Sequence, residues 1–237
     1  MKVPERIGAF FDLDGTLLAS PSLEWRFIRY LAKRDEIGAR SAIRWLRQFA
    51  ARMVAGDVHG ATYGNKCYLA GVPESAVENW AEMVAQDVRH LFGAGRDTVR
   101  WHIERGHQIV LISGTLAPLA QKIAGHLPGE VDVHATEVEV KAGCFTGRVL
   151  GPHVAGTEKA RIVRTAAVRW GLDLAQSHAY GNETADVPML ESVGSPVAVN
   201  PSWWLRRTAG IRGWPIESWE EGGGMKAIRK VEFTGAL

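Results

Sequence analysis

The chain has 237 residues, which is enough for one large domain or for a core domain with a small insert. Hydrophobic residues make up 46% of it and charged residues 23%, an ordinary globular composition that excludes a disordered protein. The formal net charge of +2 excludes a strongly basic protein that binds nucleic acid. The apolar run near the N-terminus ends in acidic residues and is too short for a signal peptide or a membrane span.

The cysteine content points to a reducing compartment. Cys67 and Cys144 are the only cysteines, and they lie far apart in the chain. Their separation matches no zinc-ligand spacing and argues against a disulfide framework. We therefore expect a cytoplasmic protein.

The first 91 residues predict one strand followed by a helical segment. Residues 7–11 form a short apolar run without polar alternation, typical of a buried parallel strand. Apolar residues then recur at three- and four-residue spacing, which predicts helices over 23–32, 42–54 and 74–91. Glycine-containing breaks separate these helices.

After Gly93, strands and helices alternate. Helices are predicted over 96–105, 116–126, 157–170, 187–193 and 202–209, and strands over 108–112, 131–136, 177–180 and 196–199. Residues 137–149 contain two runs of alternating residue types joined by a glycine-containing turn, which predicts a β-hairpin. The alternation predicts an α/β fold with a doubly wound, mostly parallel, Rossmann-like sheet.

The order of the elements also predicts the domain organisation. The first strand belongs to the α/β core, so we expect a core of residues 1–19 and 92–221 interrupted by a helical cap of residues 20–91. An insert directly after the first strand lies over the carboxyl ends of the parallel strands, where open sheets bind ligands. The glycine run 222–224 predicts a flexible joint to a tail of residues 222–237.

The strongest chemical signal is the segment Asp12-Leu13-Asp14-Gly15-Thr16 after the first strand. Two aspartates two residues apart bring two carboxyl groups to one edge of the sheet. One can attack as a nucleophile while the other moves protons, and both can help to hold a cation. A calcium loop is excluded because its glycine belongs at the sixth position, whereas Gly15 occupies the fourth.

At these residues the chain resembles the haloacid dehalogenase superfamily, whose first motif is Asp-x-Asp-Gly-Thr. The family's second motif is a Ser or Thr that ends the next core strand, and Ser113 stands there, before Gly114. A hydroxyl beside the N–H groups of the following helix start suits a phosphate oxygen. The third motif is a lysine near a helix start, matched by Lys159, whose charge would neutralise the phosphoryl group and the nucleophile.

The fourth motif departs from the family pattern. The family has an acidic Gly-Asp-x-x-x-Asp, whereas this chain has Asn182 at the position of the first, metal-binding aspartate. Asn182 can still offer a carbonyl oxygen to Mg²⁺, but it lowers the negative charge of the site by one. Asp186 stands at the position of the second acid.

Further segments, including residues 145–148 and 156–159, look like the phosphoserine phosphatase-like branch of subfamily IB, which carries a helical C1-type cap. The resemblance implies a Mg²⁺-dependent phosphomonoester hydrolase. Asp12 would attack phosphorus and form an aspartyl-phosphate, while Asp14 would protonate the leaving alkoxide and then activate water. The residues that the resemblance assigns to the metal are Asp12, Asp14, Asn182 and Asp186.

Two other functions stay open at this point. Asn182 is compatible with a metal-impaired scaffold or regulatory protein without turnover. A metal-free dehalogenase is the second alternative, since that branch also has an asparagine late in its pattern. Asp14 argues against it, because dehalogenation needs no proton for the leaving group.

The cap is expected to select the substrate. Phosphoserine phosphatases of this branch carry a glutamate at the cap entrance; the matching position falls near Pro21, with Glu24 close by. We expect Glu24, Arg26 and Gly114 to contact a small anionic or lipid-derived phosphomonoester. Residues 22–56 carry eight basic and three acidic side chains, an excess that would attract such an anion.

The basic segment 41–52 has two interpretations. It predicts either a cap helix that packs Ile43, Leu46, Phe49 and Ala50 inward, or a surface that makes weak contact with an anionic membrane. No nucleic-acid partner is expected.

Overall fold

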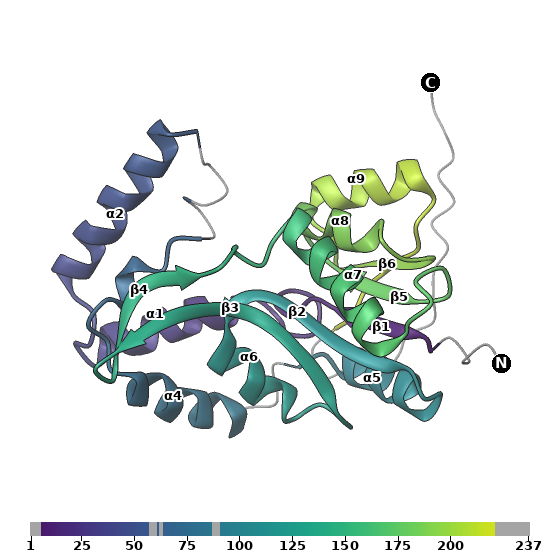
Figure 1. Cartoon of the computed structure of the whole chain (residues 1–237), viewed down its shortest axis with the longest axis horizontal. Helices are drawn as coiled ribbons and strands as arrows, with labels where there is room; N and C mark the ends of the chain where they lie inside the picture. Colours follow the sequence, from purple (N-terminus) through teal and green to yellow (C-terminus); the bar gives the residue numbers. More distant parts are fainter. Residues whose placement is uncertain (1–5, 57–60, 62–63, 87–90, 221–237) are drawn as a thin grey trace.

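A seven-stranded sheet forms the centre of the computed structural model, which describes residues 6–56, 61, 64–86 and 91–220 (Figure 1). The strand order is β4-β3-β2-β1-β5-β6-β7, and all neighbours are parallel except β3 and β4. The strands are β1 (Gly8–Phe11), β2 (Gln108–Leu116), β3 (Val131–Lys141), β4 (Cys144–Leu150), β5 (His178–Gly181), β6 (Ser195–Val199) and β7 (Ile216–Glu217).

Helices cover both faces of this sheet. One buried cluster joins Phe11 and Leu111 to α5 (Gly93–Glu104) and α6 (Ala117–Ala124). Phe10 and Val110 point to the other face, which is covered by α7 (Thr157–Trp170), α8 (Val187–Leu190) and α9 (Trp203–Arg212). The side chains of successive strand residues thus point to opposite faces of the sheet, as a doubly wound sheet requires. The predicted fold class is confirmed.

The strand register brings the candidate site residues to one edge. Phe11, the last residue of β1, pairs with Leu111 of β2 and with Tyr180 of β5. The residues that follow these three positions therefore lie at the same carboxyl edge of the sheet, with Asp12 at the centre.

Some predicted bounds differ from the structure. β2 continues to Leu116 through a register shift between Ser113 and Leu116, so the serine lies inside an irregular strand. The predicted hairpin is confirmed, but β3 runs without interruption from the core sheet into it. β7 was not predicted, because two residues are too few for a periodic signal. The predicted tail lies outside the described residues.

The helical insert consists of α1 (Leu23–Lys33), α2 (Ala39–Val54), the short helix η1 (Cys67–Leu69) and α4 (Glu74–Gln86), on the left of Figure 1. It also pairs with the hairpin, since Gly71 donates its N–H to Phe145 and Phe145 donates to Val72. Phe27 and Trp80 belong to the same buried cluster as Phe11. None of the helices in the described parts combines the length and apolarity that a bilayer span needs.

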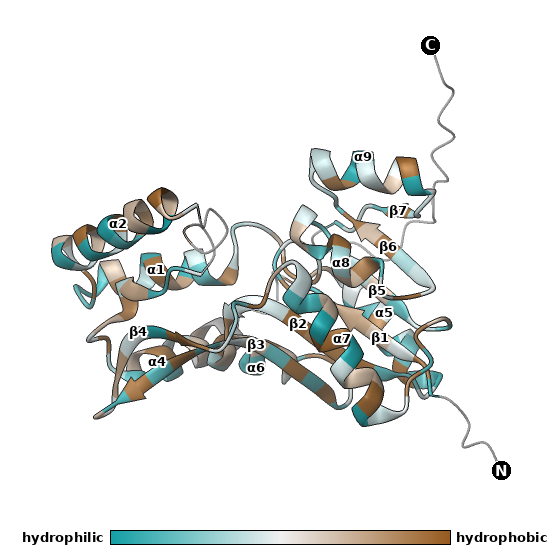
Figure 2. Cartoon of the chain, turned by 45° about the horizontal axis from the view of Figure 1, so that its top comes forward, coloured by the Kyte–Doolittle hydropathy of each residue, from teal (hydrophilic) through white to brown (hydrophobic). Residues whose placement is uncertain are grey.

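The predicted inward face of α2 is wrong for Ile43, Leu46 and Ala50, whereas Phe49 is half-buried as expected. Ile43 and Leu46 are 58% and 60% exposed, and Ala50 is exposed as well. The inward face carries Trp45 and Phe49, whose rings stack with centroids 5.2 Å apart. Apolar and basic residues alternate along the whole helix (Figure 2), so its pattern alone did not define one inward stripe.

Gly147 of β4 fixes how closely the hairpin approaches the insert. It has φ +79°, and a Cβ there would lie 2.7 Å from the Cα of Cys67. Gly143 in the hairpin turn has a similar φ of +72° but no neighbour within 4 Å of its would-be Cβ. Substitution of either glycine would introduce backbone strain, but only substitution of Gly147 would also introduce a steric clash. A comparison of the two positions therefore distinguishes the two costs.

We expect Gly147→Ala to destabilise the protein by about 1–3 kcal/mol more than Gly143→Ala. Both changes place a side chain at positive φ, at a cost of roughly 1–2 kcal/mol, but only the first pushes β4 away from η1. Urea unfolding of the two variants and the wild type measures the difference. Equal losses would show that the hairpin does not pack tightly on the insert.

Candidate active site

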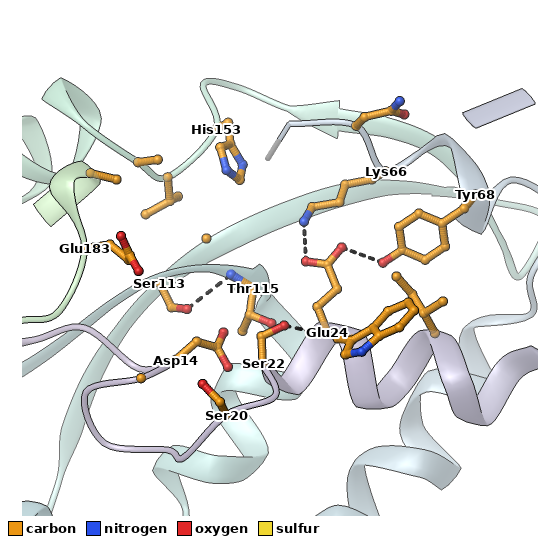
Figure 3. A pocket seen from close by; sticks show the side chains of 18 of the residues that line it. Asp14, Ser20, Ser22, Glu24, Lys66, Tyr68, Ser113, Thr115, His153 and Glu183 are labelled. Atoms are coloured by element: carbon orange, nitrogen blue, oxygen red, sulfur yellow. Dashed lines mark hydrogen bonds and ion pairs between the residues drawn. The ribbon is translucent and has the colours of Figure 1, made fainter. Parts of the chain in front are cut away.

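The loop after β1 holds the two aspartates in different environments. Asp12 is 6% exposed, and its N–H donates to the carbonyl of Tyr180 on β5 at 2.9 Å. Asp14 Oδ1 accepts a 2.6 Å hydrogen bond from the N–H of Leu23, the first residue of α1. The start of a helix favours a negative charge, so α1 orients the Asp14 carboxylate. Figure 3 shows this side chain directed toward the pocket.

Lys159 joins three elements through two ion pairs. Its ammonium lies 2.6 Å from Asp12 Oδ1 and 2.6 Å from Asp186 Oδ1. The side chain is 4% exposed and comes from the first turn of α7. The buried cation therefore compensates two carboxylates that would otherwise repel each other at the end of the sheet.

The pKa values reflect this burial. Burial raises the pKa of Asp12, against the opposing effect of Lys159. Burial also raises the pKa of Asp14 to about 6, with the N–H of Leu23 acting in the opposite direction. Burial lowers the pKa of Lys159, but the two carboxylates beside it outweigh that effect and hold the value above its usual range. Lys159 is accordingly a permanent cation, whereas Asp14 can exchange a proton near neutral pH.

Gly15 gives Asn182 room to approach the first loop. Gly15 has φ +86°, and a Cβ at this position would lie only 2.0 Å from Asn182 Nδ2. The hydroxyl of Thr16 lies 3.1 Å from Asp12 Oδ2 and 3.4 Å from Asn182 Oδ1. A carboxylate oxygen and an amide oxygen thus converge on one point at the edge of the sheet.

Both carboxylate oxygens of Asp186 already have partners in the protein. Oδ1 is paired with Lys159, and Oδ2 accepts 2.9 Å hydrogen bonds from the N–H groups of Asn182 and Glu183. Asp186 therefore orients the turn after β5 and the lysine. This arrangement differs from the direct metal contact that the resemblance implied.

Ser113 and Gly114 lie at the carboxyl edge of the sheet, but within the irregular part of β2 and not at the end of the strand as the second motif predicted. Ser113 Oγ accepts the N–H of Thr115 at 3.1 Å, and both line the pocket. The carbonyl of Gly114 accepts a 2.9 Å hydrogen bond from the Thr136 hydroxyl. That hydroxyl also lies 3.2 Å from His153 Nδ1, so it links the strand bulge to a histidine of the pocket wall.

The cap wall contains an ion pair that the sequence did not reveal (Figure 3). Glu24 on α1 forms an ion pair with Lys66, and its other oxygen accepts a 2.6 Å hydrogen bond from the Tyr68 hydroxyl. Lys66 and Tyr68 are buried. Both lie in or next to the short helix η1, where no periodic pattern or motif marks them. The acidic residue that we expected in the pocket is there, but its charge is compensated from within the cap.

Arg26 was expected to contact the substrate, and the structure places it elsewhere. Its guanidinium donates to the carbonyls of Ala19 and Pro21, at 2.6 and 2.8 Å. It is absent from the set of described residues that line the pocket. Arg26 thus holds the loop that leads into α1.

A cavity of about 930 Å³ lies between these two walls. Its polar floor is formed by the motif residues at the edge of the sheet. Toward the cap the lining combines the Glu24–Lys66 ion pair and Tyr68 with the large apolar side chains of Trp25, Ile28, Ile37 and Trp45. The cavity therefore has a charged end at the sheet and a mainly apolar end at the cap.

Comparisons with known proteins agree with this fold. Residues 9–191 match the profile of the haloacid dehalogenase-like hydrolases. A protein of Streptomyces azureus named inhibition of morphological differentiation protein is 34% identical over 218 residues, which cover 89% of this chain and 78% of that protein. A phosphoserine phosphatase of Mycobacterium tuberculosis is 35% identical over 218 residues, 88% of this chain and 69% of that one.

Solved structures show the same architecture. A protein of unknown function from Bordetella pertussis Tohama I has a TM-score of 0.74 and 30% identity, covering 90% of this chain and 98% of its own. A substrate-bound phosphoserine phosphatase complex has a TM-score of 0.65 at 18% identity, covering 92% and 95% of the two chains, and it supports the fold alone.

These findings define a hydrolase with a Rossmann-like core. The chain belongs to the haloacid dehalogenase-like hydrolase family. Within that family it is a phosphatase.

Proposed function

We propose that the protein hydrolyses phosphomonoesters through an aspartyl-phosphate formed on Asp12. The observation that carries this proposal is the buried Asp12–Lys159 ion pair, with both residues lining the cavity at its charged end. A carboxylate at this position is held by a cation that can also neutralise an incoming phosphoryl group. The residues 20–91 would act as the cap that closes this site, and residues 1–19 and 92–221 as the catalytic core.

In the first step, a carboxylate oxygen of Asp12 forms a bond to phosphorus and the bond to the ester oxygen breaks. Asp14 gives its proton to the departing alkoxide, in agreement with a pKa raised to about 6 by burial. The Ser113 hydroxyl and the N–H of Gly114 would hold phosphoryl oxygens.

In the second step, the Asp14 carboxylate takes a proton from water as the water oxygen attacks phosphorus. The bond between phosphorus and Asp12 breaks, and inorganic phosphate leaves. Each proton released in one half-reaction is thus taken up in the other, and Asp14 returns to its starting state.

The oxygen donors at this edge fit Mg²⁺. The side-chain oxygens of Asp12 and Asn182 converge near the Thr16 hydroxyl, and Mg²⁺ prefers such oxygen ligands. We propose that these two side chains and the backbone carbonyl of Asp14 hold the ion, while Asp186 positions Asn182. When bound, Mg²⁺ offsets negative charge on the phosphoryl group and the nucleophile.

The same geometry argues against the two alternatives. A scaffold without turnover would not need Asp12, Asp14 and the Ser113 hydroxyl to line one cavity together. A dehalogenase would not need Asp14, which α1 holds in place through the N–H of Leu23. The relatives named as phosphatases favour phosphate chemistry as well.

We further propose that the substrate is a lipid-derived phosphomonoester. Glu24 is paired with Lys66 and Tyr68, so it is not free to hold the ammonium group of a substrate such as phosphoserine. The apolar end of the 930 Å³ cavity would instead receive an alkyl chain. The exposed Ile43 and Leu46 beside the arginines of α2 support weak contact with an anionic membrane, as part of this proposal.

The nucleophile and the proton carrier can be separated by substitution. We expect Asp12→Asn to abolish turnover, and Asp14→Asn to lower the rate on an alkyl phosphate by about 10²–10⁴-fold. The matched control is Asp97→Asn, at a partly exposed aspartate on α5, which should keep the wild-type rate. Phosphate release in the presence of Mg²⁺ is the measurement. Wild-type rates for either site variant would refute the assignment.

Asn182 gives a direct test of the metal position. Asn182→Asp adds one negative charge beside Asp12, and we expect the Mg²⁺ concentration for half-maximal activity to fall by roughly tenfold. Gln121→Glu adds the same charge on the exposed face of α6 and should leave that concentration unchanged. An unchanged or weaker Mg²⁺ dependence in Asn182→Asp would show that Asn182 is not a ligand.

The apolar end of the cavity predicts the substrate preference. Ile28→Ala should raise KM for lysophosphatidate by about tenfold or more and leave KM for glycerol phosphate unchanged, because only the acyl chain reaches this residue. Ile211→Ala, at a residue that is 77% exposed, is the matched control. Phosphoserine is the third substrate to be compared. A wild-type preference for phosphoserine over lysophosphatidate would overturn the lipid proposal and leave the phosphatase assignment intact.

A further inference from the structure

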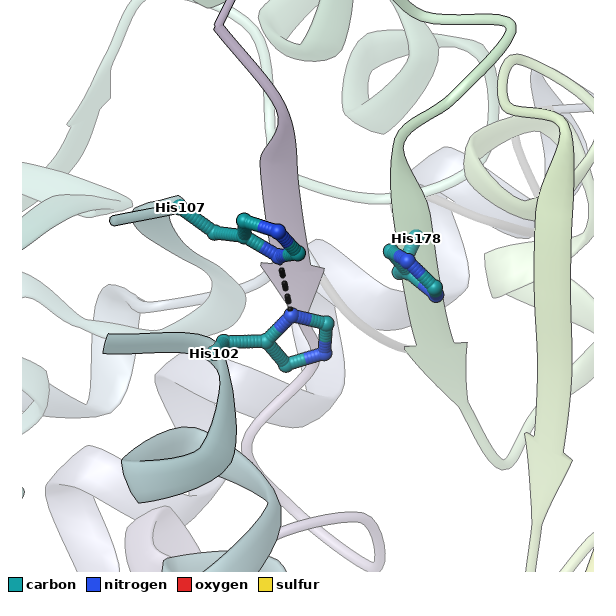
Figure 4. A group of neighbouring side chains, drawn as sticks. All are labelled: His102, His107 and His178. Carbon is teal, nitrogen blue, oxygen red and sulfur yellow. Dashed lines mark hydrogen bonds between the residues drawn. The ribbon is translucent and has the colours of Figure 1, made fainter. Parts of the chain in front are cut away.

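Three histidines meet at the amino edge of the sheet, opposite the candidate active site (Figure 4). His102 lies near the end of α5, His107 directly precedes β2, and His178 is the first residue of β5. Each offers one ring nitrogen, and these three nitrogens all lie within 4.8 Å of one another. Three separate elements thus direct imidazole groups to one point.

The hydrogen bonds of His102 show which of its two ring nitrogens faces the other histidines. His102 is fully buried, and its Nε2 lies 2.9 Å from the Tyr180 hydroxyl. Its Nδ1 lies 2.7 Å from His107 Nδ1 (Figure 4). Of two ring nitrogens at that distance, one carries the proton and the other offers its lone pair. A cation in place of this shared proton would be held by both lone pairs.

The surroundings keep the three rings neutral. Burial lowers the pKa of His102 to about 3, and it lowers the pKa of His107 and of His178 as well. The guanidinium of Arg105, which lies 3.9 Å from the centre of the Trp101 ring, lowers the pKa of His102 and of His107 further. A neutral imidazole is the form that binds metal ions.

We propose that His102, His107 and His178 form a binding site for Zn²⁺. Imidazole nitrogen is a preferred ligand of zinc, and a site with three histidines leaves the fourth position to water. Zn–N bonds of about 2.0–2.1 Å place the ligand nitrogens of a tetrahedral site roughly 3.3 Å apart. The rings reach this spacing when the two Nδ1 atoms separate slightly and the partly exposed His178 turns inward.

Tyr180 would orient the buried ligand. With Nδ1 of His102 on the metal, the proton of this ring is on Nε2 and donates to the Tyr180 oxygen. Metal-ligating histidines usually donate their second ring N–H to an oxygen in this way. The ion would tie the end of α5 to the starts of β2 and β5, and it would stabilise the fold without taking part in hydrolysis. The positive charge of Arg105 repels a bound cation, and the three metal–nitrogen bonds have to outweigh this repulsion.

Cobalt absorption tests the site in the full-length wild-type protein after removal of metals with EDTA. Tetrahedral Co²⁺ with nitrogen ligands absorbs visible light much more strongly than octahedral Co²⁺ with oxygen ligands, so the signal distinguishes this site from the proposed Mg²⁺ site. We expect one equivalent of Co²⁺ to give strong absorption, and one equivalent of Zn²⁺ to displace it and raise Tm. A wild-type protein without this absorption would refute the proposal, whatever the variants do.

Substitutions then locate the ligands. His107→Gln and His178→Gln should each weaken Co²⁺ binding by about 100-fold or more and remove the rise in Tm, while hydrolysis in Mg²⁺ continues. His126→Gln, at an exposed histidine outside the group, is the matched control and should bind Co²⁺ as the wild type does. Strong absorption that persists in both site variants would place the cobalt elsewhere and overturn the assignment.

Discussion

The ammonium group of Lys159 is the constraint on which the site depends. It lies within 2.6 Å of carboxylate oxygens from the loop after β1 and from the turn after β5. Without it, Asp12 and Asp186 would be two buried like charges, and the two chain segments would be driven apart. Because the lysine is itself buried, it has no competing partner in water. In the proposed reaction, the same charge that stabilises the fold would also meet the phosphoryl group.

The sequence located the charged end of the cavity because its residues follow strands. In a parallel sheet the carboxyl ends of neighbouring strands meet at one edge, so Asp12, Ser113 and Asn182 had to lie close together. The role of Asp186 could not be deduced in the same way. Its spacing from Asn182 placed it correctly, but only the folded turn shows that both of its oxygens are engaged by the protein.

The cap was harder to predict, for two physical reasons. Lys66 and Tyr68 occupy a segment without periodicity, and their partner Glu24 lies 42 and 44 residues away, so only the tertiary structure brings them together. On α2, apolar and basic residues occur all around the helix. The sequence pattern was therefore equally consistent with a helix that buries Ile43 and with one that buries Trp45. Trp45 packs against the buried cluster that contains Tyr68 and Leu69 of η1, whereas Ile43 and Leu46 remain on the surface.

Tyr180 connects the two ends of the central strands. Its carbonyl accepts the N–H of Asp12, its ring stacks on Phe11 with centroids 4.6 Å apart, and its hydroxyl contacts His102. One residue of a strand only four residues long thus contacts both the histidine group and the loop that carries Asp12. Bound zinc would tie the start of β5 to the start of β2 and to α5, whereas Lys159 joins the turn after β5 to the loop after β1 at the opposite edge. The two sites would then restrain the same strand, β5, from its two ends.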